Sequence, residues 1–152
     1  MLVALATPMT YVLPQPNEPV RIDMCSLSQP LRADQVALIP VHRDETSTSM
    51  GVVTEAVDFT NVGTKAVTDV ELVFVERDPF GGSALVRQSV HGSYAPNVRI
   101  NGTHWKSRTR IVEFAGAYCT VARVGFADGS AWSAGKGFLR GAVALPTAAP
   151  SP

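Results

Sequence analysis

The 152-residue sequence has few charged residues and no excess of either sign. Its 13 Lys and Arg residues balance 13 Asp and Glu residues, so the formal net charge is zero, and charged residues make up only 17% of the chain. A general nucleic-acid binder needs surplus basic charge to displace counterions, so nucleic acid is not expected as a partner. No apolar run approaches the ~20 residues of a membrane-spanning helix, so no transmembrane segment is predicted.

Compact motifs for metal, redox or nucleophilic chemistry are also missing. The three histidines and two cysteines form none of the short spacings that hold zinc or a redox centre. The chain has no Gly-x-Ser-x-Gly turn. We therefore predict no metal, no cofactor and no enzymatic activity. Because a catalytic triad is defined by geometry, a small hydrolase with a site dispersed over His42, His91 and His104 stays open as an alternative.

Proline and glycine divide the chain into three parts. Seven of the 11 prolines lie in the first 19 or the last seven residues, whereas all 12 glycines lie between Gly51 and Gly141. Apolar residues make up 45% of the chain, enough for one domain with a proper core. We predict an extended N-terminal segment over 1–19, a folded domain over 20–140 and a flexible Ala/Pro-rich tail over 141–152.

The main pattern inside the domain is alternation of apolar and polar residues with a period of two. Val20, Ile22 and Met24 alternate with charged residues. Such alternation is typical of half-buried strands, because successive side chains point to opposite faces. Turn signals separate the runs, among them Asp128-Gly129, which favours a two-residue type I′ hairpin turn. The predicted strands are 20–27, 36–39, 51–60, 67–77, 84–91, 97–100, 108–115, 118–127 and 130–134.

This pattern predicts an all-β fold, an antiparallel β-sandwich of about seven to nine strands with extended Pro-rich termini. A single sheet would leave one face of the strand carrying Val70, Leu72 and Phe74 uncovered, and a second sheet covers it.

One stretch resembles a known family. The run from Val57 to Gly63 has the strand and Asn-x-Gly turn that open immunoglobulin-like domains of bacterial envelope and secreted proteins. The run from Phe74 to Gly81 keeps the Phe, Asp and Gly of the F-x-L-Y-D-x-x-G motif of FxLYD domains, with Glu76 and Arg77 in place of Leu and Tyr. The resemblance implies an exported immunoglobulin-like accessory domain without catalytic residues.

The ends of the chain and its cysteines bear on the compartment. Residues 1–6 resemble the end of a signal peptide, with a small-x-small pattern at Ala4-Leu5-Ala6; an ordinary apolar N-terminus is the alternative. Cys25 and Cys119 are the only cysteines. In an exported protein they would form one disulfide, and in a cytosolic protein two buried thiols. We expect a secreted, periplasmic or cell-envelope protein, with a cytoplasmic one as the alternative.

The zero net charge hides an asymmetry along the chain. Residues 1–76 carry ten acidic and four basic residues, and residues 77–152 carry three acidic and nine basic ones. In a sandwich the two halves of the chain intermix, so the asymmetry can average out; otherwise a basic edge remains. The densest basic stretch supplies our candidate binding residues, which are Arg99, His104, Trp105, Lys106, Arg108 and Arg110.

These observations favour a non-enzymatic, exported β-sandwich that acts as an interaction or accessory module. Its expected partner is an unidentified protein or an anionic glycan or surface, and self-association stays open. The alternatives are a carbohydrate- or anion-binding module that uses Trp105 and the Arg99–Arg110 stretch, and the small hydrolase.

Overall fold

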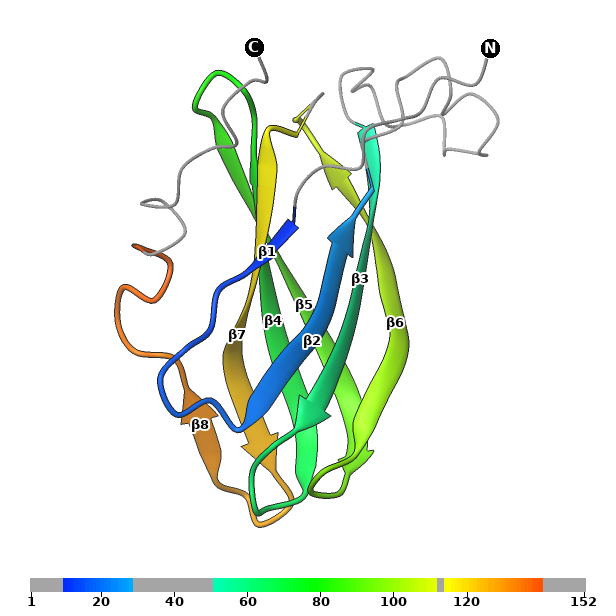
Figure 1. The fold of residues 1–152 in the computed structure, drawn as a ribbon, viewed down its shortest axis with the longest axis vertical. Coiled ribbons are helices and arrows are strands. Elements are labelled where there is room, and N and C mark those ends of the chain that lie inside the picture. The colour runs from blue at the N-terminus through cyan, green and yellow to red at the C-terminus, as the bar shows by residue number, and fades with distance from the viewer. Residues whose placement is uncertain (1–9, 29–50, 112–113, 141–152) are drawn as a thin grey trace.

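The structure is a computed structural model that describes residues 10–28, 51–111 and 114–140 (Figure 1). These residues form an all-β sandwich, as the sequence predicts. Its eight strands are β1 (Thr10–Val12), β2 (Val20–Leu27), β3 (Gly51–Asn61), β4 (Val67–Arg77), β5 (Ser83–Tyr94), β6 (Arg99–Thr109), β7 (Gly116–Phe126) and β8 (Ala131–Ser133).

The strands form two sheets that pack face to face. One sheet has the order β1-β7-β4-β5, with β8 also paired to β7, and the other has the order β2-β3-β6. Figure 1 shows β2, β3 and β6 lying over β7, β4 and β5. All pairs are antiparallel except β1 with β7, which is parallel. The sheet therefore includes residues that the sequence assigned to the extended N-terminal segment.

Apolar side chains from both sheets fill the space between them. Val57 and Phe59 of β3 face Leu72 and Phe74 of β4, and all four are fully buried. The period-two pattern dictates this arrangement, because the in-phase residues of each strand share one face. Burial of this apolar area is the main driving force for the fold.

Strand β4 is buried on both of its faces. Val73 and Val75 point away from the main core and pack with Tyr118 of β7. Tyr11, from the N-terminal strand, stacks on Tyr118 with 5.6 Å between ring centroids, and Phe138 packs against the same cluster. Segments near both ends of the described chain thus cover the outer face of the five-stranded sheet.

The predicted and observed strands differ most around β6. The predicted break between 97–100 and 108–115 is wrong, because β6 runs unbroken from Arg99 to Thr109. Asn-Gly pairs favour turns, but Gly102 takes up its positive φ of 74° at a β-bulge inside the strand, where the β3–β6 register shifts. The predicted strand 36–39 lies outside the described residues.

The hairpin predicted at Asp128-Gly129 joins β7 to β8. The Gly129 amide donates to the Phe126 carbonyl at 3.0 Å, and the Ser130 amide donates to the Asp128 carboxylate at 2.9 Å. The predicted type I′ turn is wrong, since Gly129 has a positive φ of 84° but Asp128 does not. A type I′ turn needs positive φ at both central residues.

Cys25 of β2 and Cys119 of β7 form a disulfide, as the sequence predicts for an exported protein. Their Cα atoms are 6.5 Å apart and 94 positions separate them along the chain. The bridge links the two sheets through the core, where Cys119 is fully buried. Among the described residues, no helix is long and apolar enough to cross a membrane.

Candidate functional site

Strand β6 presents a line of basic side chains on the outer face of the three-stranded sheet. Its residues alternate along the strand, so His104, Lys106 and Arg108 are exposed while Trp105 and Thr109 are partly or fully buried. We call His104, Lys106 and Arg108 the basic stripe. Arg110 follows the end of β6 and is also exposed.

Trp105 lies on the opposite side of the same strand. Its ring packs edge-on against Phe74 of β4, with 5.9 Å between ring centroids and an interplanar angle of 66°. It is one of the partly buried side chains that pack against the core. The structure therefore separates Trp105 from the basic residues with which the sequence grouped it, and the ring offers no platform beside the basic stripe.

Arg99, at the other end of β6, is held by acidic residues. Its guanidinium lies 3.3 Å from the Asp58 carboxylate and 3.8 Å from that of Asp23. Burial raises the pKa of Asp23, but hydrogen bonds from Thr60 and Arg21, together with the charges of Arg21 and Arg99, outweigh it and lower that pKa. The charge of Arg99 is thus balanced, and this residue does not extend the basic stripe.

The same pairing cancels much of the charge asymmetry between the two halves of the chain. Acidic residues of β3 and β4 pair with basic residues that come later in the sequence. The pairs are Asp58 with Arg99, Asp69 with Arg123, and Glu71 with Arg87. Within the described part of the chain, however, Lys106 makes no ion pair, so positive charge remains on β6.

The described residues of β3 that pair with the basic stripe are neutral and small. On β3, the residues opposite His104, Lys106 and Arg108 are Ala56, Thr54 and Val52, respectively. These side chains are short, so they leave the longer basic side chains of β6 standing above the sheet. This geometry suits contact with an extended acidic surface better than enclosure of a small ligand.

Of the histidines proposed for a dispersed hydrolase site, the two described ones lie on different sheets. His91 is exposed on β5 of the five-stranded sheet, His104 is exposed on β6 of the three-stranded sheet, and His42 lies outside the described residues. The described residues also contain no group of three or more His, Cys, Asp or Glu side chains placed to hold a metal.

Two carboxyl groups that the sequence analysis did not single out are fully buried between the sheets. Glu55 of β3 and Glu76 of β4 are both 0% exposed. Thr109 donates a hydrogen bond of 2.7 Å to Glu76, while both oxygens of Glu55 and the other oxygen of Glu76 accept none from a described residue. The sequence pattern could have identified Glu55 as buried. Glu55 is two residues from both Val53 and Val57, so the three side chains share the inward face of β3.

Burial controls the ionisation of this pair. It raises the pKa of Glu55, against a partial opposing effect of the nearby Ser107 and Gln88 side chains. It also raises the pKa of Glu76, where the Thr109 hydrogen bond opposes the shift and the charge of Glu55 adds to it. Because neither carboxyl reaches the surface, we expect the pair to affect stability rather than contact with a partner.

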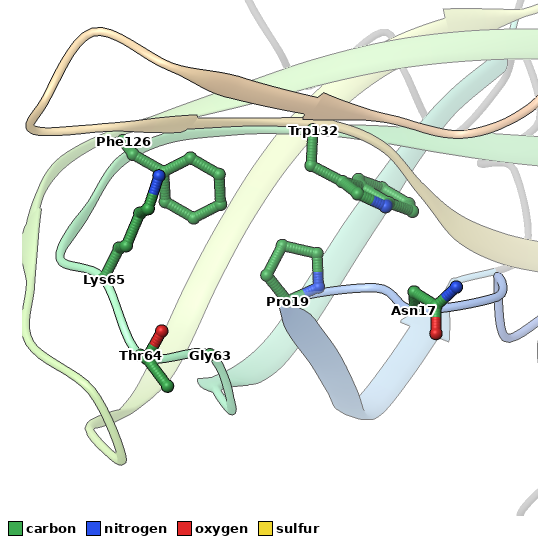
Figure 2. Close-up of a pocket in the computed structure, with 7 residues that line it drawn as sticks. All are labelled: Asn17, Pro19, Gly63, Thr64, Lys65, Phe126 and Trp132. Carbon is green, nitrogen blue, oxygen red and sulfur yellow. The ribbon is translucent and has the colours of Figure 1, made fainter.

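A pocket of about 260 Å³ lies at one end of the sandwich (Figure 2). It is formed by the segment before β2, the β3–β4 turn and the β7–β8 hairpin, which meet at the lower end of the molecule in Figure 1. We call it the end pocket. Its lining residues are Asn17, Pro19, Gly63, Thr64, Lys65, Phe126 and Trp132.

No family model and no curated protein matches this chain. Among solved structures, the Northeast Structural Genomics Consortium target SoR45 is 10% identical, with a TM-score of 0.43, over 76% of this chain and 80% of that one. The putative ApaA protein from Bordetella pertussis is 13% identical, with a TM-score of 0.39, over 77% of this chain and 89% of that one. Similarity at this level assigns neither a family nor a function.

Proposed function

We propose that the chain is a non-enzymatic, exported interaction module that recognises an acidic protein partner through the basic stripe. The observation that carries the proposal is the alternation on β6, which places His104, Lys106 and Arg108 together on one exposed face. Positive charge on an open sheet face attracts an acidic surface and sets its orientation more than it sets raw affinity. An anionic glycan is the second candidate, since its charge would be recognised by the same residues.

Export is the second part of the proposal and is supported by the Cys25–Cys119 disulfide. Disulfides persist in secreted and periplasmic proteins and are rare in the reducing cytosol. An affiliation with exported immunoglobulin-like domains of the FxLYD type stays a prediction from the sequence. It agrees with the sandwich and with a role that needs no catalytic residue.

The acidic partner is tested with a charge-reversal variant of the basic stripe. Replacing Lys106 and Arg108 by glutamate should weaken binding to an immobilised poly-glutamate peptide by about tenfold, as expected for two exposed charges. Binding by the unaltered protein should weaken as salt rises, because exposed charges are screened. Surface plasmon resonance over a salt series measures both effects, with a heparin-type sulfated glycan on a parallel surface.

The matched control is the double variant Lys136→Glu/Arg140→Glu, which reverses two exposed charges outside the basic stripe. It should leave binding within about twofold of the unaltered protein. Equal losses in the control and the charge-reversal variant would indicate a nonspecific effect of net charge and would overturn the proposal. Preference for the sulfated glycan, with the same loss in the variant, would favour the second candidate function.

A further inference from the structure

The end pocket is built from segments that are fixed by hydrogen bonds. The amides of Val62 and Gly63 both donate to the Pro19 carbonyl, at 2.9 and 3.1 Å, which ties the β3–β4 turn to the segment before β2. The fully buried Asn61 side chain donates to the carbonyls of Lys65 and Tyr94, at 2.9 and 3.0 Å. The pocket is therefore preorganised, which lowers the entropy cost of binding a ligand.

One side of the end pocket is aromatic and apolar. Trp132 of β8, Phe126 of β7 and Pro19 supply this surface, and all three side chains are only partly buried. Figure 2 shows the indole of Trp132 beside Pro19, with the ring nitrogen on the edge facing Pro19 and Asn17. A partly exposed indole whose N–H bonds no described residue can offer both a stacking surface and a hydrogen bond.

The polar groups around this apolar surface are neutral and available. The Asn17 amide, the Thr64 hydroxyl and the Trp132 N–H make no hydrogen bond to another described residue. Asn17 lines the pocket from an exposed turn position with a positive φ of 56°. Together the three groups present several donors and two acceptors.

The charge of Lys65 is already satisfied. Its ammonium lies 2.8 Å from the Asp128 carboxylate, donates to Ser130 at 3.0 Å and lies 5.3 Å from the centre of the Phe126 ring. The hydrogen bond from Lys65 is the main cause of a lowered pKa at Asp128, and the hydrogen bonds from Ser130 lower that pKa further. An anionic ligand would have to displace Asp128, so the end pocket favours an uncharged ligand.

We propose that the end pocket binds one neutral sugar ring of a glycan, stacked on Trp132 and hydrogen-bonded by Asn17 and Thr64. A pyranose has an apolar face that matches an indole and hydroxyls that match neutral donors and acceptors. The volume of about 260 Å³ is below the roughly 300–1,000 Å³ of pockets for drug-sized ligands, so it suits a single ring. This site is separate from the basic stripe and does not depend on the proposed function.

The test uses saturation-transfer difference NMR on the full chain with four neutral probes. The probes are the methyl glycosides of glucose, galactose, mannose and N-acetylglucosamine. At least one should bind with a dissociation constant of about a millimolar, the range expected for a ligand of about a dozen atoms. The Trp132→Ala variant should weaken that binding by about tenfold or more, through loss of stacking and of one hydrogen bond.

Two milder variants keep the proposal testable if Trp132→Ala disturbs the hairpin. Asn17→Gly removes the amide but tolerates the positive φ, and Thr64→Val removes the hydroxyl at nearly constant shape. Each should weaken binding by about two- to tenfold, as for one neutral hydrogen bond. The control is Trp105→Phe, which changes the core indole and should leave sugar binding unchanged.

Three outcomes would overturn the proposal. The first is absence of saturation transfer to all four probes at about 20 mM, well above the expected dissociation constant. The second is sugar binding that survives both Trp132→Ala and Asn17→Gly. The third is a clear preference for glucuronate over methyl glucoside, because it would mean that Lys65 leaves Asp128 to bind an anion.

Discussion

Replacing both Cys25 and Cys119 by alanine should lower the free energy of unfolding by about 4–5 kcal/mol, the chain-entropy value for a loop of this length. The bridge closes a long segment, since 94 positions separate the two cysteines. Without it, the unfolded chain gains conformational freedom while the strands keep their contacts. Because small domains are stable by only about 5–15 kcal/mol in total, this loss is a large part of the stability.

The bridge also has a local role in the sandwich. It connects β2 of the three-stranded sheet to β7 of the five-stranded sheet, so it holds the two layers together through the core. Equilibrium unfolding in urea measures the change. The slope of the unfolding free energy against urea should rise in the variant, since an unbridged unfolded chain exposes more surface.

The unaltered protein under reducing conditions is the control for this experiment. If the bridge acts through the unfolded chain, reduction should destabilise the protein nearly as much as the double substitution does. Equal urea midpoints for the oxidised, reduced and substituted proteins would contradict the prediction. Two free thiols in protein recovered from an oxidising compartment would in addition remove the support for export.

The strands that the sequence predicted best are those with the clearest local alternation. The bounds of β2 and β4 agree with the predicted 20–27 and 67–77. Their apolar residues face a partner sheet, so the local pattern and the tertiary packing favour the same structure. In β6, the glycine at position 102 is typical of a turn, although the strand continues through it. Only the pairing with β3 shows that the chain forms a bulge at this position.

The sequence analysis grouped Trp105 with the basic residues of β6, and this error has a simple cause. The basic stretch from Arg99 to Arg110 was identified from composition, which does not tell one face of a strand from the other. Alternation places Trp105 on the face opposite His104 and Lys106, and the structure shows that arrangement. Applied to this stretch, the period of two would have predicted the separation.

The end pocket could not have been predicted from local patterns. Asn17, Thr64 and Trp132 come from three segments that are far apart in the sequence and meet only through the sheet topology. The short strand β1 was missed for the same reason, since its pairing with β7 joins Thr10 to Ala117. Local patterns in a single sequence do not reveal nonlocal contacts of this kind.

The buried carboxyls of Glu55 and Glu76 lead to the second large prediction. Burial raises the pKa of both groups in the folded protein above that of an unfolded glutamate, which is about 4.3. The folded state therefore holds these protons more tightly than the unfolded state does. Their contribution to stability is fully present below about pH 4.3 and is lost as the pH rises through the folded pKa values.

Glu76→Gln should accordingly raise the free energy of unfolding at neutral pH by about 1–3 kcal/mol, the cost of a buried polar group without a partner. The glutamine keeps nearly the same shape, can still accept the hydrogen bond from Thr109, and cannot ionise. Its amide group can also donate toward the unpartnered oxygens of Glu55. Below about pH 4 the gain should disappear, because the wild-type carboxyls are then protonated.

Urea unfolding of both proteins between about pH 4 and pH 8 isolates this effect. The difference between the two proteins removes the opposite trend of Asp23, whose lowered pKa makes its stabilisation fade only as the pH falls below about 4. Glu71→Gln is the matched control, since Glu71 lies on the same strand but pairs with Arg87 at the surface. It should change the stability by less than about 1 kcal/mol at every pH.

A destabilised Glu76→Gln variant at neutral pH would contradict this account, because it would show that the ionised carboxylate is stabilised in the folded protein. A gain that stays constant across the pH range would point instead to better packing by glutamine. If the folded interior favours the protonated form of both carboxyls, the increase in the free energy of unfolding should grow as the pH rises. Glu55→Gln should show the same pH-dependent increase. The contribution of Glu55 and Glu76 to the free energy of unfolding would then be largest at acidic pH, because the buried surroundings disfavour their ionised forms.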